Sequence, residues 1–157
     1  MDYDIIGGVH GHADKLTALL TELGYCRRMG TWRHPRRTAV CVGDFIDRGP
    51  HQLDTIDIVR PMVDAGSALA VMGNHEFNAI AWYLRDPDQD DEYLRPRQGK
   101  VGEENRNQHA AFLAESRAQA RPSWRDYRLA SLTTAVARIA RTAVDSRLLA
   151  SELCRGA

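Results

Sequence analysis

The sequence predicts an α/β fold, with a parallel sheet of β-α-β-α-β order flanked by helices. Three short segments rich in apolar residues, 3–7, 38–42 and 68–72, each lead into a glycine followed by polar residues, which is typical of buried parallel strands. Segments of helical periodicity separate them, so right-handed crossovers are expected. The 157 residues are enough for one domain with its own core.

Two helices are predicted between these strands. The first covers 13–23 and ends at Gly24, and the second covers 53–65 and ends at Gly66, since glycine commonly caps the C-terminus of a helix. The apolar residues that define the two helical faces are Leu16, Leu19, Leu20 and Leu23 in the first and Ile56, Val59 and Val63 in the second.

The remaining segments are more polar. Residues 27–37, with Gly30 and Pro35 among arginines, predict a loop or a hairpin before the second strand. Residues 85–100 are dense in Asp, Pro, Gln and Gly and predict an exposed loop, and residues 103–115 predict a helix.

The charged residues divide unevenly along the chain. Residues 1–115 carry 13 basic and 18 acidic side chains, whereas residues 116–157 carry 8 and 3 and are rich in Ala, Arg and Ser. This pattern argues against a uniformly basic nucleic-acid-binding surface, and no nucleic-acid partner is expected. We therefore expect one domain segment at 1–115 and an Arg/Ala-rich helical tail at 116–157.

The cysteines and the apolar runs bear on location. Cys26, Cys41 and Cys154 are odd in number, widely spaced and without a CxxC pair, which argues against a disulfide framework and a structural zinc site. The N-terminus is acidic, and no apolar run approaches the roughly 18 residues of a membrane span. The expectation is a cytoplasmic protein with reduced thiols and no membrane partner.

Polar clusters follow each predicted strand, at 7–12, 43–49 and 73–76. The carboxyl ends of parallel strands meet at one edge of a sheet, where ligands bind. Taken singly, His10 has the simpler interpretation of a surface residue, and Asp44 or Asn74 that of a turn or helix N-cap beside turn-forming glycines. Three such clusters at consecutive strand ends favour a functional site.

The side chains in these clusters suit metal and phosphate chemistry. Mixed His, Asp and Asn donors fit Mn²⁺, Fe or Zn²⁺, and a carboxylate such as Asp44 can bridge two ions about 3.5–4 Å apart. Arg48 offers a planar fork for phosphate oxygens. Its simpler interpretation is a surface arginine.

Together the clusters resemble the signature of the calcineurin-like metallophosphoesterases, in particular the phosphoprotein-phosphatase branch and its small bacterial members. That signature reads GD-x-HG, GD-x-x-DRG and GNHE, and residues 43–49 and 73–76 match the second and third blocks completely. The resemblance covers about residues 1–115. It implies a partial metallophosphoesterase sandwich that hydrolyses phosphate esters with a metal-activated water.

The resemblance implies two divalent metal ions. His10 would bind the first, Asp44 would bridge both and Asn74 would bind the second. The first block has Gly8 where the family has an acidic ligand. The only histidine after residue 76 is His109, which we assign to a solvated helix face rather than to either of the family's later metal ligands. An incomplete metal site and impaired or absent activity are therefore expected.

The resemblance also implies the catalytic residues. His75 would be the general acid, oriented by Asp47, and Arg48 would bind the phosphoryl group of a phosphoprotein, a dinucleoside polyphosphate or a small phosphoester. The alternative from another class is a non-catalytic phosphate- or partner-binding remnant of the family. An amidohydrolase, suggested by His10-x-His12, would need a barrel of about 250 residues, which the length excludes.

Three interpretations of the tail remain open. Leu, Val and Ile recur at helical spacing among arginines at 124–150, which fits an amphipathic helix that covers the sheet or lies on a membrane surface. Charge, composition and family resemblance change together near 115–116, which favours a shift of reading frame at that point. Strand-like segments carrying two histidines in another frame of the gene would support the shift, and their absence would refute it.

Overall fold

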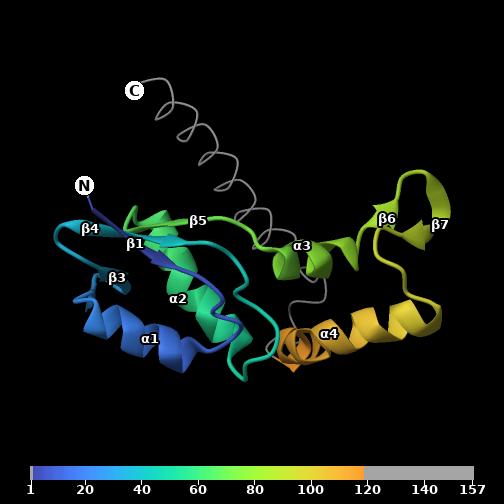
Figure 1. Cartoon of the computed structure of the whole chain (residues 1–157), viewed down its shortest axis with the longest axis horizontal. Coiled ribbons are helices and arrows are strands. Elements are labelled where there is room, and N and C mark those ends of the chain that lie inside the picture. Colours follow the sequence, from blue (N-terminus) through green and yellow to red (C-terminus); the bar gives the residue numbers. More distant parts are fainter. Residues whose placement is uncertain (1, 119–157) are drawn as a thin grey trace.

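The computed structural model describes residues 2–118, and its centre is a three-stranded parallel sheet (Figure 1). Strand β4 (Arg37–Cys41) lies between β1 (Asp2–Ile6) and β5 (Ala68–Ala70). Both pairings are parallel. The predicted α/β class and parallel order are confirmed. The tail from residue 119 on, with its three interpretations, lies outside the described residues.

Two helices cover one face of this sheet (Figure 1). Helix α1 (Ala13–Glu22) follows β1, and α2 (Gln52–Asp64) follows β4. The first ends as predicted where the chain turns through Gly24 at a φ of +86°, a conformation that glycine adopts without strain. The residues that these helices bury include Leu16, Leu20, Val59 and Met62.

The opposite face of the sheet is exposed among the described residues. Side chains alternate along a strand, so in β1 Ile6 is buried whereas Ile5 is 76% exposed and Tyr3 51% exposed. Just past β4, Val42 is also exposed, whereas Cys41 is buried. The expectation of buried strands therefore holds for one face of the sheet within residues 2–118, because both crossover helices lie on the same side.

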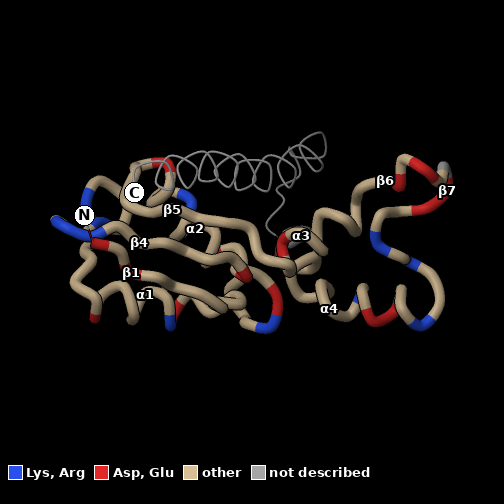
Figure 2. The backbone as a smooth tube through the Cα atoms, turned by 45° about the horizontal axis from the view of Figure 1, so that its top comes forward, with Lys and Arg blue, Asp and Glu red and all other residues tan. Residues whose placement is uncertain are grey.

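The segment between α1 and β4 forms a hairpin. Strands β2 (Cys26–Arg28) and β3 (Thr31–Arg33) are antiparallel. Met29 and Gly30 join them with φ of +52° and +82°, as a two-residue hairpin turn of type I′ requires. Figure 2 shows basic residues gathered at this end of the sheet, opposite α3 (Asn74–Ala81) and α4 (Gly99–Ala118).

The loop predicted at 85–100 is wrong for part of its length. It contains a second hairpin, β6 (Arg85–Asp86) and β7 (Gln89–Tyr93), and the helix predicted at 103–115 already begins at Gly99. The Asp86 carboxylate accepts a hydrogen bond from the Asp88 N–H at 2.9 Å, an Asx turn that reverses the chain. Such a hairpin forms without an apolar pattern, which is why the composition resembled a loop.

The hydrophobic core contains side chains from the helices and from the loop that follows β4. Phe45 and Ile46, directly after β4, are 1% and 2% exposed, and Phe112 and Leu113 of α4 belong to the same buried cluster. No helix within residues 2–118 is both long and apolar enough to span a bilayer.

Burial makes the two described cysteines chemically different. Desolvation raises the pKa of the Cys41 thiol to about 11, whereas Cys26 is exposed. Because the thiolate is the reactive form, we expect iodoacetamide at about pH 8 to label Cys26 at least about tenfold faster than Cys41. Peptide-resolved mass spectrometry measures both rates. In urea, where the protein is unfolded, the two cysteines should be labelled at equal rates. Equal labelling rates in the folded protein would contradict the buried position of Cys41.

Candidate metal centre

The loops after β1 and β4 are joined by backbone hydrogen bonds. The N–H of His10 donates to the carbonyl of Asp44 at 2.7 Å, and the N–H of Gly49 donates to the carbonyl of His10 at 2.7 Å. His51 N–H donates to the Gly11 carbonyl at 2.9 Å. The first two sequence clusters therefore lie side by side at the carboxyl edge of the sheet, as expected from the strand order.

The glycines in these loops allow close packing of backbones. A Cβ atom on Gly43 would collide with the backbone nitrogen of Gly73, and a Cβ on Gly73 would collide with the Asp44 carboxylate. The glycine of the second cluster thus contacts the glycine of the third. This is a requirement for space, beyond the turn formation that glycine ordinarily provides.

Glu76 holds the third cluster against the second. Its carboxylate is 2% exposed and accepts hydrogen bonds at 2.7–3.2 Å from four backbone N–H groups. The donors are Gly73, Asp44, Phe45 and Ile46. The sequence reasoning missed this role, for which the last residue of the GNHE block was the available signal.

Backbone strain gathers at the predicted site residues. His10, Asp44, Asp47 and Arg48 have φ of +45°, +56°, +65° and +71°. Among the described non-glycine residues, the only other one at positive φ is Met29, in the β2–β3 turn. Left-handed backbone at non-glycine residues persists where the surroundings enforce it and is concentrated at functional sites.

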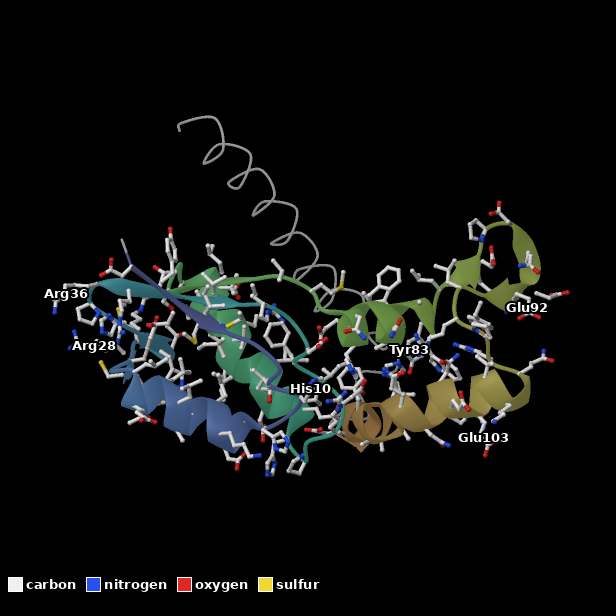
Figure 3. The ribbon with its side chains drawn as sticks, in the orientation of Figure 1. His10, Arg28, Arg36, Tyr83, Glu92 and Glu103 are labelled. Atoms are coloured by element: carbon white, nitrogen blue, oxygen red, sulfur yellow. The ribbon has the colours of Figure 1, made fainter. Side chains whose placement is uncertain are left out.

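His10 is oriented toward Asp44. Its Nδ1 lies 3.3 Å from the Ile46 carbonyl oxygen, which can only accept, so Nδ1 carries the proton and Nε2 keeps its lone pair. That Nε2 lies 4.0 Å from Oδ2 of Asp44. Figure 3 places His10 at the end of the sheet away from Arg28 and Arg36. Metal-binding histidines commonly have the tautomer fixed in this way.

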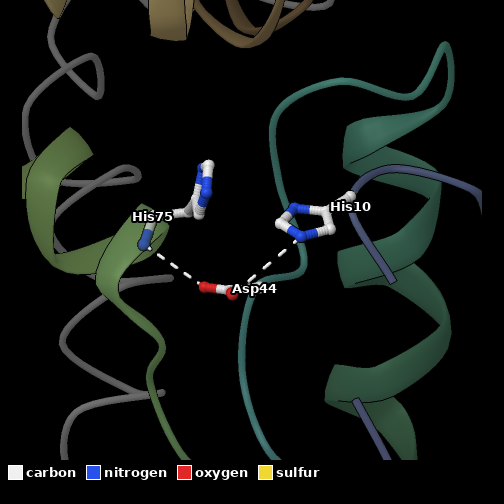
Figure 4. A group of neighbouring side chains, drawn as sticks. All are labelled: His10, Asp44 and His75. Carbon is white, nitrogen blue, oxygen red and sulfur yellow. Dashed lines mark hydrogen bonds and ion pairs between the residues drawn. The ribbon is translucent and has the colours of Figure 1, made fainter. Parts of the chain in front are cut away.

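His75 lies on the other side of Asp44 (Figure 4). Its backbone N–H donates to Oδ1 of Asp44 at 3.3 Å. Its Nδ1 lies 2.7 Å from Oδ2 of Asp47, so the proton on Nδ1 points to this carboxylate and Nε2 is left as the available nitrogen. The rings of His10 and His75 meet edge to face, with centroids 4.8 Å apart.

The donors of His10 and Asp44 fit a divalent cation. Ligand atoms of His10, Asp44 and His75 all lie within 4.8 Å of one another. Two ligands each about 2.2 Å from a cation are at most about 4.4 Å apart, which the 4.0 Å separation of His10 and Asp44 satisfies. Asn74, predicted as a ligand, is exposed at the first position of α3, and Arg48 is exposed on the Asp44 loop.

The assignment of His109 to a solvated helix face is wrong. His109 is 0% exposed, and its Nδ1 lies 2.8 Å from Oδ2 of Asp47. Phe112 and Leu113 follow it by three and four residues and are buried on the same face of α4. That spacing is the signal of burial in the sequence.

Asp47 lies between the two imidazoles. Burial by itself would raise the pKa of this carboxyl, but its contacts with His109 and His75 outweigh burial and lower the pKa. Asp47 therefore remains a carboxylate at neutral pH and can accept the Nδ1 proton of His75.

The parallel sheet, the joined loops and the His and Asp donors at its carboxyl edge agree with the fold and candidate metal ligands expected of a calcineurin-like metallophosphoesterase. Residues 1–118 match the family model of the calcineurin-like phosphoesterases, and the chain belongs to that family, which uses divalent metal ions. The expected resemblance is confirmed. The division of the chain near residue 115 stays a prediction.

Similar proteins are bis(5'-nucleosyl)-tetraphosphatases called PrpE (asymmetrical). The chain is 47% identical over 76 residues to PrpE of Halalkalibacterium halodurans. The aligned residues make up 48% of this chain and 31% of the relative. It is 40% identical over 86 residues to PrpE of Bacillus subtilis, and these residues make up 54% of this chain and 35% of that relative. The chain thus spans about a third of the length of these relatives.

Proposed function

We propose that this chain carries the first part of a phosphoester-hydrolysing site. The observation that supports this most directly is the approach of His10 and Asp44 from two loops and of His75 from the first turn of α3, with the proton of His10 directed away from the shared space. The names of the PrpE relatives favour a dinucleoside polyphosphate as substrate over a phosphoprotein or a small phosphoester.

Each residue has a distinct proposed role. His10, Asp44 and Asn74 would hold divalent cations, which when bound supply Lewis-acid stabilisation of phosphoryl oxygens and an acidified water. His75 would give a proton from Nε2 to the leaving oxygen. Asp47 accepts the hydrogen bond from Nδ1 and so keeps Nε2 directed to the site. Arg48 would bind phosphoryl oxygens through its guanidinium group.

The metal site is proposed to be incomplete in this chain. Gly8 brings no carboxylate to the space beside His10, and His109 is occupied with Asp47. We therefore expect less than one tightly bound Mn²⁺ per chain and very little turnover of an aryl phosphate. Two bound ions with robust turnover would refute the alternative of a non-catalytic binding remnant. A cytoplasmic location, with neither nucleic acid nor membrane as partner, stays a prediction.

Asp44 is the residue to test first, because it lies between both histidines. We expect Asp44→Asn to weaken Mn²⁺ binding by at least about tenfold, since the ion loses its charged ligand. Isothermal titration calorimetry measures the affinity. The matched control is Asp54→Asn, which changes an exposed carboxylate of α2 whose neighbour is His51, the residue before the helix. Equal affinity of the Asp44 variant and the control would contradict the proposed centre.

A further inference from the structure

Two histidines approach the same oxygen atom of one buried carboxylate. The Nδ1 atoms of His75 and His109 lie 2.7 and 2.8 Å from Oδ2 of Asp47. The His75 contact is a hydrogen bond, whereas the His109 contact is at ion-pair distance without hydrogen-bond alignment. Asp47 is 2% exposed and His109 is 0% exposed. His75 is the second residue of α3, beside the candidate metal centre, whereas His109 comes from the middle of α4, 34 residues further along the chain.

The Asp47 carboxylate has little else to hold it. Its other oxygen, Oδ1, has no hydrogen-bond partner among the described residues. The backbone N–H of Asp47 donates to Oε1 of Gln52 at 2.8 Å, which positions the loop but not the carboxylate. A carboxylate bound only to His75 could rotate together with that ring. It can orient His75 only if a third group holds it in place.

We propose that His109 is a positioning residue, whose imidazole, with Nδ1 in buried contact with Oδ2, holds the Asp47 carboxylate so that Asp47 fixes the ring of His75. The proposal rests on the proposed role of His75 in phosphoester hydrolysis. It adds a residue of α4 to a site otherwise built from the loops after β1, β4 and β5. His109 acts through Asp47.

Helix α4 is itself attached to the first turn of α2, next to the loop that carries Asp47. The Glu115 carboxylate accepts hydrogen bonds from the N–H groups of Gln52 and Leu53, at 3.0 and 3.1 Å. These N–H groups belong to the first turn of α2, which otherwise leaves them without helical partners. Since α2 follows directly after the Asp47 loop, this contact keeps His109 and Asp47 in register.

The residue beside His109 supports the same arrangement. Nε2 of Gln108 lies 3.4 Å from Nδ1 of His75, and Oε1 of Gln108 accepts a hydrogen bond from Arg95 at 2.7 Å. The carboxylate of Asp47 is closer and can only accept, so the Nδ1 proton of His75 belongs to Asp47. Gln108 then packs against the ring without competing for its proton.

The test compares two amide side chains at position 109. In His109→Asn the amide nitrogen can occupy the place of Nδ1, whereas in His109→Gln it falls near the place of Nε2. A role in core packing alone would be served about equally by both. Positioning of Asp47 requires a donor at the place of Nδ1. We therefore expect the asparagine variant to keep the orientation of His75 and the glutamine variant to lose it.

The first readout is the Nδ1–H proton signal of His75 in the ¹⁵N-labelled full chain, assigned by its loss in Asp47→Asn. We expect this signal to remain sharp in His109→Asn and to broaden through solvent exchange in His109→Gln. The second readout is hydrolysis of an aryl phosphate with Mn²⁺. There kcat should fall at least about tenfold in the glutamine variant, with KM and Mn²⁺ affinity changed less than about twofold.

The two readouts separate this proposal from the proposed function. If the chain shows no turnover, the proton signal still decides the positioning role, and only the hydrolytic function fails. A sharp His75 signal in a folded glutamine variant would overturn the proposal. Unfolding of both position-109 variants, with Asp47→Asn still folded, would also overturn it by assigning His109 to the core alone.

Discussion

Replacement of Glu76 with glutamine should lower the free energy of unfolding by about 3 kcal/mol. The carboxylate accepts hydrogen bonds from four backbone N–H groups, three of them in the loop after β4. A glutamine amide accepts only at its oxygen, and its NH₂ group would face N–H donors. Buried donors left without acceptors are costly, and here they belong to the backbone on which Asp44 lies.

Urea unfolding followed by circular dichroism measures this loss, provided that the m value is unchanged. The matched control is Glu115→Gln, because Glu115 also accepts two backbone N–H groups, at the less buried first turn of α2. That substitution should cost about 1 kcal/mol, as for the loss of a helix cap. An effect of Glu76→Gln no larger than that of the control would show that the four contacts add nothing beyond capping.

Substitution of Gly8 by aspartate should tighten Mn²⁺ binding at least about tenfold. A Cβ atom on Gly8 would have only Cδ2 of His10 within reach, at 4.0 Å. The φ of +62° costs a side chain about 1–2 kcal/mol, and aspartate is among the residues that tolerate this conformation. The new carboxylate would supply the charged ligand that the space beside His10 lacks.

Calorimetric titration with Mn²⁺ and hydrolysis of an aryl phosphate test this variant against a close control. Gly30→Asp places the same residue at a φ of +82°, with nothing within 4 Å of its Cβ, but in the β2–β3 turn. It should leave Mn²⁺ affinity unchanged. If a folded Gly8→Asp binds Mn²⁺ no better than Gly30→Asp, the proposed ligand position is wrong.

The sequence was sufficient for the parts of the fold that depend on local pattern. Apolar segments ending at glycine predicted β1, β4 and β5, and the strand order then predicted that His10 and Asp44 would meet. Strand β7 was missed because its acidic residues resemble a loop, and only its pairing with β6 reveals it. The pairing of the backbone carries no apolar signature.

The site was predictable up to the contacts that cross long distances in the chain. The clusters that carry Asp44 and His75 were found, because both follow predicted strands. The role of Glu76 and the burial of His109 depend on contacts with residues about 30 and 62 positions away. No local period encodes such contacts, although the spacing of His109 to Phe112 does place both on one helical face.

Four site residues, His10, Asp44, Asp47 and Arg48, have a left-handed backbone conformation, and this affects how selection acts on the chain. At about 1–2 kcal/mol each, they amount to a large share of the 5–15 kcal/mol by which a typical domain is stable. Glycine at any of them would relieve the strain and remove a side chain of the site. Evolution for thermal stability alone would therefore erase these residues, so their persistence would distinguish a working site from a decaying one.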